Sequence, residues 1–179
     1  KQLIEDIYKL LLFFTLSILY FYSVTGFGKL ISNKNSNFFD LQLDGTIVLL
    51  LIGYFLYITI GINLALNSFI ILFGLGLFLF YKKYYIIKFK YIFILFLVTF
   101  SLLIISKTHE DFNLYHYFSI FEIFNNRLRI GIPILNNYFI HSSHLALNQA
   151  LLVLPFINFK IIHLPIFIIY MCVIGYFSI

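Results

Sequence analysis

The chain has 179 residues, of which 62% are hydrophobic and 11% are charged, and its formal net charge is +5. Soluble domains carry roughly 25% charged residues, and a chain of this length must leave much of its surface exposed, so a soluble globular protein is excluded. The positive charge does not indicate a nucleic-acid partner. The lysines stand at the ends of apolar runs, where lysines anchor lipid headgroups and set membrane topology.

We therefore expect an integral membrane protein of the all-α class, a polytopic bundle of about five to six transmembrane helices. The apolar runs are continuous, whereas the strands of a membrane barrel alternate in segments of ~10 residues. The whole chain, 1–179, is predicted to form a single transmembrane helical domain. Because it begins at Lys1 and ends at Ile179 inside an apolar run, we also expect it to be incomplete.

The first half of the chain is predicted to hold four spans, over residues 10–25, 46–66, 69–81 and 91–106. A polar connection over 29–45 follows the first span, and Asn67 and Ser68 are expected to form the turn before the third. The third span has only about 13 residues, so we expect it to extend into 64–66 or past its C-terminal end.

Polar and small residues near these spans have ordinary structural interpretations. Asp40 and Asp44 in the polar connection are expected to be solvated or helix-capping groups. Glycines often let membrane helices approach each other closely. The glycines inside the second and third predicted spans are Gly53, Gly61, Gly74 and Gly76.

The last part of the chain is predicted to form a fifth span over 145–159 and a sixth over 161–179. His163 marks the break between them and is interpreted as an interfacial or capping residue rather than a ligand. Cys172 has no cysteine partner, which excludes a disulfide framework, and is expected to be a small buried or lipid-facing residue.

Topology follows from the distribution of lysine and arginine. Four lysines crowd the short segment 82–90, which the positive-inside rule places in the cytoplasm. Crossing the fourth predicted span then places residues 107–140 on the outer face. We expect the membrane to be the bacterial inner membrane.

Residues 107–144 form a polar loop in this otherwise apolar sequence. Adjacent carboxylates repel each other, so at a membrane boundary Glu110 or Asp111 should be protonated, paired with a cation or bound to a metal ion. The pair is open to three roles: general base, metal ligand, or anchor for Lys107 or Arg127. A solvated helix end is the alternative.

An aromatic segment follows the carboxylate pair and is expected to form an interfacial helix over 111–124. In a helix, one face would be shared by Asp111, Tyr115, Phe118 or Ser119, and Glu122. This face could be the floor of a polar site, or the segment could be an ordinary amphipathic helix.

Basic residues follow the predicted interfacial helix. Arg127 and Arg129 are suited to bind phosphate, because guanidinium groups donate bidentate hydrogen bonds to it, either specifically or as lipid headgroup contacts. His141 and His144 begin a polar stripe that continues at Asn148. With Asp111 the histidine pair could bind a metal ion, and the alternative is hydrogen bonding to a neighbouring helix or lining of a polar cleft.

The run HEDFNLYHYF resembles the first outer loop of the GT-C superfamily of polytopic glycosyltransferases, and the stretch 106–155 is also similar to a large family of bacterial polytopic membrane proteins. The matching residues are Glu110 and Asp111, followed by Tyr115 and Tyr117. The resemblance implies a sugar donor linked to polyprenyl phosphate. In the superfamily the acidic motif commonly follows the first span, whereas here four predicted spans precede it.

The resemblance implies that Asp111 is the catalytic base or orients the acceptor, and that Glu110 supports it or binds a divalent cation. The predicted substrate-binding residues are His109, Tyr115, His116, Arg127, Arg129, His141 and His144. Two other functions stay open: a transporter or flippase module whose polar stripe lines a pathway, and a non-enzymatic subunit whose polar segment binds a membrane protein partner.

Overall fold

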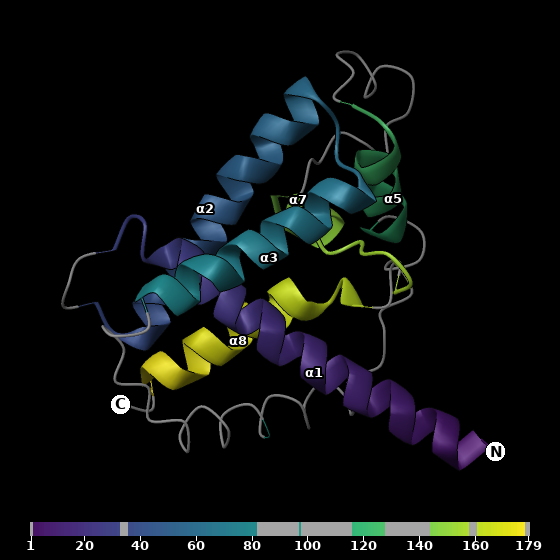
Figure 1. Cartoon of the computed structure of the whole chain (residues 1–179), viewed down its shortest axis with the longest axis horizontal. Helices are drawn as coiled ribbons and strands as arrows, with labels where there is room; N and C mark the ends of the chain where they lie inside the picture. The colour runs from purple at the N-terminus through teal and green to yellow at the C-terminus, as the bar shows by residue number, and fades with distance from the viewer. Residues whose placement is uncertain are drawn as a thin grey trace.

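The computed structural model describes residues 2–32, 36–81, 97, 116–127, 144–157 and 161–177. In this part of the chain all regular secondary structure is helical and there is no β-strand. This confirms the all-α prediction there (Figure 1). The helices are α1 (Gln2–Gly28), α2 (Phe38–Thr59), α3 (Leu64–Tyr81), α5 (Tyr117–Asn125), α7 (His144–Ala150) and α8 (Leu164–Phe177).

Three of these helices are long and apolar enough to cross a membrane: α1, α2 and α3. Their apolar segments contain 18 to 22 residues, and at 1.5 Å per residue they extend about 27–33 Å, close to the ~30 Å of a hydrocarbon core. These lengths and compositions are compatible with an integral membrane protein. The predicted total of five to six spans stays a prediction, since the segment 91–106 lies almost wholly outside the described residues.

The outward surface of α2 supports this conclusion. Apolar side chains recur every three or four residues along it and are exposed to the surroundings: Leu43, Ile47, Leu51, Phe55 and Ile58. This spacing places them in one stripe along the helix. A continuous exposed apolar stripe of this length fits contact with lipid acyl chains.

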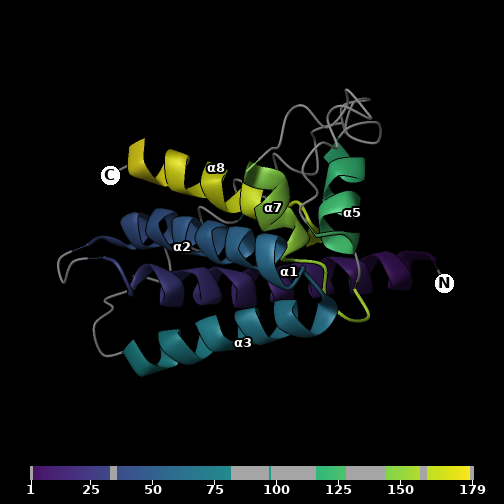
Figure 2. The same cartoon turned by 90° about the horizontal axis from the view of Figure 1, so that it is seen from above.

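The three long helices and α8 are stacked in layers. In the view of Figure 2 the order is α3, α1, α2 and α8, and α1 packs against both α2 and α3. The C-terminus of α1, the N-terminus of α2 and the C-terminus of α3 share one end of the bundle, which we call the Lys29 end. At the opposite end, the α5 end, α5 stands across the bundle beside α7 and the turn between α2 and α3 (Figures 1 and 2).

Close backbone contacts hold α1 against its two neighbours. A Cβ atom on Gly45 would lie 1.9 Å from the carbonyl oxygen of Val24, and one on Gly26 would lie 2.1 Å from the carbonyl oxygen of Gly74. Any larger residue would force the helices apart. Gly74 thus lies at a close approach of α3 to α1, and Gly26, just beyond the predicted first span over 10–25, lies inside α1 at the same contact.

The other predicted glycines differ from one another. Gly53 faces α7, where a Cβ would lie 3.1 Å from the side chain of Leu147. No atom of the described residues lies within 4 Å of the Gly76 Cβ position, so no helix contact among them requires glycine there. Gly61 lies beyond the end of α2, and its φ of +90° belongs to the turn before α3. For Gly61, the prediction of a place inside the second span is wrong.

The start of α2 corrects the predicted polar connection over 29–45. Asn37 and Asp40 form a capping box, in which Asn37 Oδ1 accepts from the Asp40 amide (2.8 Å) and Asp40 Oδ2 accepts from the Asn37 amide (3.1 Å). Asp40 is therefore a capping residue, as predicted. In the second turn after this cap, Gln42 is buried against α1, where it donates to the carbonyl oxygen of Phe21 (3.0 Å) and to the Thr25 hydroxyl.

The turn between α2 and α3 also lies earlier than predicted. α2 ends at Thr59, and the Asn63 side chain accepts from the Leu66 amide (3.0 Å), which caps a helix starting at Leu64. Asn67 is then a buried residue inside α3 rather than part of a turn. The expected extension of the third span into 64–66 is confirmed.

The predicted fifth span is wrong for the residues that can be described. α7 ends at Ala150, and the chain turns through 151–157. Asn67 stabilises this ending, since its Nδ2 donates to the carbonyl oxygens of Ala150 (2.9 Å) and Val153 (2.8 Å). Pro155 follows, and proline cannot donate a helical hydrogen bond.

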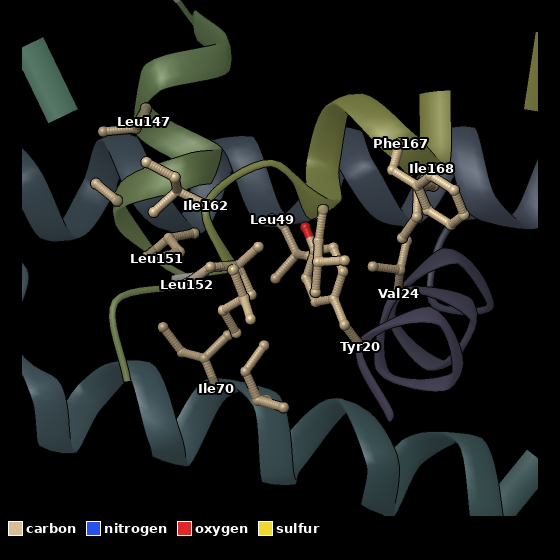
Figure 3. Packing of buried hydrophobic residues seen from close by; sticks show 14 of the residues in the cluster. Tyr20, Val24, Leu49, Ile70, Leu147, Leu151, Leu152, Ile162, Phe167 and Ile168 are labelled. Carbon is tan, nitrogen blue, oxygen red and sulfur yellow. The ribbon is translucent and has the colours of Figure 1, made fainter. Parts of the chain in front are cut away.

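The hydrophobic core lies where α7 and α8 meet the three long helices. Figure 3 shows Tyr20, Val24, Leu49 and Ile70 from the long helices facing residues of the C-terminal part. The latter include Leu147, Leu151, Leu152, Ile162, Phe167 and Ile168. Cys172 on α8 is buried, which confirms its interpretation as a small buried residue.

Candidate functional site

Three of the predicted site residues belong to the described part of the chain: His116, Arg127 and His144. All three belong to the elements at the α5 end of the bundle. The other predicted site residues lie outside the described residues: His109, Glu110, Asp111, Tyr115, Arg129 and His141. Whether the carboxylate pair meets His144 therefore stays a prediction.

His144 is the first residue of α7 and contacts α2. Its Nδ1 shares a hydrogen bond with the hydroxyl of Tyr54, and the two rings meet edge to face with centroids 5.7 Å apart. When the ring proton of the neutral imidazole is on Nε2, Nδ1 accepts from the tyrosine hydroxyl. The alternative that this stripe hydrogen-bonds to a neighbouring helix is thus confirmed for His144. The pair ties the start of α7 to the C-terminal part of α2.

Glu122 brings a carboxylate of α5 to the same part of α2. It acts electrostatically on the hydroxyl of Tyr57, which lies one helical turn beyond Tyr54. Its Oε1 also accepts a hydrogen bond from Asn126 Nδ2 (2.6 Å), and its backbone carbonyl accepts from the Asn126 amide (2.9 Å). The two bonds to Asn126 lie within the C-terminal end of α5 and orient the carboxylate on that helix.

Arg127 follows α5 and lies beside the α2–α3 turn. A Cβ on Gly61 would lie 3.2 Å from Arg127 Cγ and 3.7 Å from its Nε, so the absence of a side chain at Gly61 leaves room for the arginine stem. The positive φ of Gly61 also favours glycine at this position. Arg127 is exposed, which leaves its guanidinium able to bind an anion such as phosphate.

His116 precedes α5 and is exposed, and its side chain does not cap the helix. The predicted interfacial helix over 111–124 is confirmed as helical from Tyr117 onward, and it lies across the bundle as an interfacial helix would (Figure 2). Ile120 anchors it in the core.

We call Tyr54, Tyr57, Glu122, Arg127 and His144 the end cluster. The sequence interpretation missed its two tyrosines, although a signal existed. Tyrosine is enriched where membrane spans meet water, and these two stand one turn apart at the end of an apolar run. The Tyr54–His144 bond, the effect of Glu122 on Tyr57 and the contact of Arg127 with the Gly61 turn are separate, and they bring to one bundle end a cation, a carboxylate, an imidazole and two hydroxyls. Groups of these kinds bind phosphate and hydrogen-bond to polar organic molecules.

Asn148 departs from the predicted polar stripe. One turn after the exposed His144, it is buried, and its Oδ1 has no hydrogen-bond partner among the described residues. A metal site over Asp111, His141 and His144 stays a prediction. Among the residues that the structure describes, no group of three or more histidine, cysteine or acidic side chains could hold a metal ion.

No protein-family model, curated protein or solved structure matches this chain.

Proposed function

We propose that this integral membrane protein is a glycosyltransferase of the GT-C type, which takes its sugar from a polyprenyl-phosphate-linked donor at the outer face of the membrane. One observation carries the proposal. The exposed Arg127 lies at the same bundle end as the hydrogen-bonded Tyr54–His144 pair and the Glu122 carboxylate. A lipid-linked sugar phosphate presents an anion and sugar hydroxyls at the membrane boundary, which this set of side chains suits.

The charge distribution supports the outer location. Lys29 follows α1 at one end of the bundle, and α3 ends at Tyr81 at the same end. In the sequence, Tyr81 comes directly before the lysines of 82–90. The positive-inside rule assigns this Lys29 end to the cytoplasm. Because α2 leads from there to the end cluster, the cluster is assigned to the outer face.

In the proposed reaction Arg127 binds the donor phosphate, since a guanidinium group offers bidentate hydrogen bonds to phosphate oxygens. His144 and Glu122 hydrogen-bond to sugar or acceptor hydroxyls. Asp111 is the base that accepts the proton of the acceptor hydroxyl, with Glu110 in support or as a ligand of a divalent cation.

The polar side chains inside the three long helices favour this function over a transporter. Gln42 bonds to α1, and Ser17 and Thr25 donate to carbonyl oxygens of their own helix. The Gln42 bond joins two helices, whereas the Ser17 and Thr25 bonds satisfy the hydroxyls within α1. They serve packing, whereas a transport pathway needs polar groups turned toward a substrate.

The test is a strain lacking the gene, complemented with the wild-type protein, Asp111→Asn, Arg127→Gln or Lys29→Gln at matched expression. We expect both of the first two variants to reduce sugar incorporation into surface glycan. For Arg127→Gln the loss should be on the order of tenfold or more, because a hydrogen bond to a charged group contributes ~1.5–3 kcal/mol. Lys29→Gln, at the opposite bundle end, should behave as the wild type. Unchanged glycan in the Asp111→Asn strain would contradict the proposal.

A further inference from the structure

The turn between α7 and α8 has an unusual residue at its tip. The Ile157 amide donates to the carbonyl oxygen of Leu154 (3.3 Å), which closes a four-residue β-turn with Pro155 second and Phe156 third. Phe156 has a φ of +66°. Proline fixes a negative φ at the second position, so the turn is of type II, whose third position favours glycine.

Phe156 is also fully exposed. Its relative exposure is 100%, compared with 79% for Phe80, the next most exposed large apolar residue in the described part of the chain. A bulky residue with positive φ is a genuine outlier. A phenylalanine ring that stays in water also forgoes the free energy that burial of its apolar surface would provide. Glycine would suit this turn better on both counts. The turn therefore holds an aromatic ring outward against its own backbone preference.

The position of the turn is set by α3. Asn67, in the first turn of α3, binds the carbonyl oxygen of Val153 (2.8 Å), and Leu154 packs against the hydrophobic core. The chain after α7 therefore reaches the N-terminal end of α3 (Figure 2). Because α3 is about as long as the hydrocarbon core is thick, its N-terminal end lies at the membrane boundary. Phe156 lies three residues beyond the bonded Val153, at the same boundary.

We propose that Phe156 is a membrane anchor whose ring inserts between lipid acyl chains just below the headgroups at the α5 end. Exposed apolar side chains also begin at the N-terminal end of α3, at Phe69, and continue at Leu72 and Phe73. Phenylalanine is among the residues that interfacial segments bury at the boundary between headgroups and acyl chains. Through Leu154 and Asn67, the anchor fixes the depth of α7 and hence of His144. This inference does not depend on the proposed function.

Tryptophan fluorescence tests the anchor directly, because the chain contains no tryptophan. Phe156→Trp places a single fluorophore at the tip of the turn, and Leu72→Trp, near the middle of α3, serves as a deep lipid-facing control. Both full-length variants are reconstituted in phosphatidylcholine nanodiscs. Lipids brominated near the headgroup or near the acyl end, together with aqueous acrylamide, then report the depth of each indole.

For Phe156→Trp we expect emission at shorter wavelength than that of N-acetyltryptophanamide in water, and acrylamide quenching several-fold weaker. Lipids brominated near the headgroup should quench it more strongly than those brominated near the acyl end, and Leu72→Trp should show the reverse order. Water-like emission with full acrylamide quenching would overturn the proposal. So would stronger quenching by deeply brominated lipid, or resistance to every quencher, which would indicate cover by protein.

A second variant covers the case in which tryptophan disturbs the turn. Phe156→Cys carries a spin label, while the native Cys172 is buried. Its accessibility to oxygen, relative to a water-soluble nickel complex, should match that of a shallow bilayer site. Accessibility to nickel equal to that of a free label would overturn the anchor as well.

Discussion

Gly74 and Gly76 lie two residues apart on α3 but meet different surroundings, so they form a matched pair for testing the helix packing. A Cβ on Gly74 would lie 2.2 Å from Ser23 Oγ and 2.6 Å from Cε2 of Phe27. In the part of the chain that the structure describes, a Cβ on Gly76 would meet no atom within 4 Å. We therefore expect Gly74→Ala to destabilise the fold and Gly76→Ala to stabilise it slightly.

The magnitude follows from two terms. Each substitution stabilises the folded state by about 0.5–1 kcal/mol, because alanine loses less backbone entropy than glycine in a helix. Only Gly74→Ala also suffers overpacking, which costs ~1–3 kcal/mol in a close-packed interior. The Ser23 hydroxyl can rotate away, but the Ser23 carbonyl oxygen at 2.8 Å and the buried ring of Phe27 cannot move without separating α1 from α3. The helix term cancels in the comparison, so the two variants should differ by about 1–3 kcal/mol.

Reversible unfolding of both variants, by steric trapping in bicelles, measures this difference in the free energy of unfolding. Circular dichroism would establish that both variants keep the native helix content. Equal stability changes in the two variants would refute the conclusion that α1 and α3 touch at Gly74.

Three further predictions concern hydrogen bonds and protonation. Asn67→Ala should cost about 1–3 kcal/mol and speed amide exchange over residues 151–153, because two buried carbonyl groups lose their donor; unchanged exchange there would contradict this role. A double-mutant cycle of Tyr54→Phe and His144→Ala should give a coupling energy of ~0.5–1.5 kcal/mol in the free energy of unfolding, and zero coupling would argue against the bond. Burial lowers the pKa of His163, outside the candidate spans, below its ordinary value of 6.5. The unfolded chain then binds the proton more readily, so the melting temperature in detergent should fall as the pH drops below 6.5. His163→Gln should lessen this fall, and an equally steep fall in the variant would contradict the assignment.

The sequence predicted those features of the fold that depend on local composition. The long apolar runs identified the three helices that can cross a membrane, because hydrophobic length is a property of a single segment. The start of α2 was not predictable in this way. Gln42 lies in a segment that is polar in sequence, and its burial depends on acceptors at Phe21 and Thr25 of another helix.

The candidate site shows the same difference between features set by a single segment and features set by contacts between segments. The sequence indicated that His144 and Arg127 belong to a polar region, because charged and polar residues are rare in this chain. It could not supply their partners. Tyr54 is 90 residues from His144 along the chain. Gly61 meets Arg127 because α5 packs against α7 and α7 packs against α2. Contacts between distant segments require the assembled bundle.

The central claim is that the α5 end binds a lipid-linked phosphate through Arg127. Native mass spectrometry of the detergent-solubilised protein with polyprenyl phosphate, in the presence of excess phosphatidylglycerol as a competing anionic lipid, measures this binding directly. We expect one bound polyprenyl phosphate on the wild-type protein and on Lys29→Gln. Affinity should fall on the order of tenfold or more for Arg127→Gln. Equal binding by Arg127→Gln and the wild type, or complete displacement by phosphatidylglycerol, would contradict the claim.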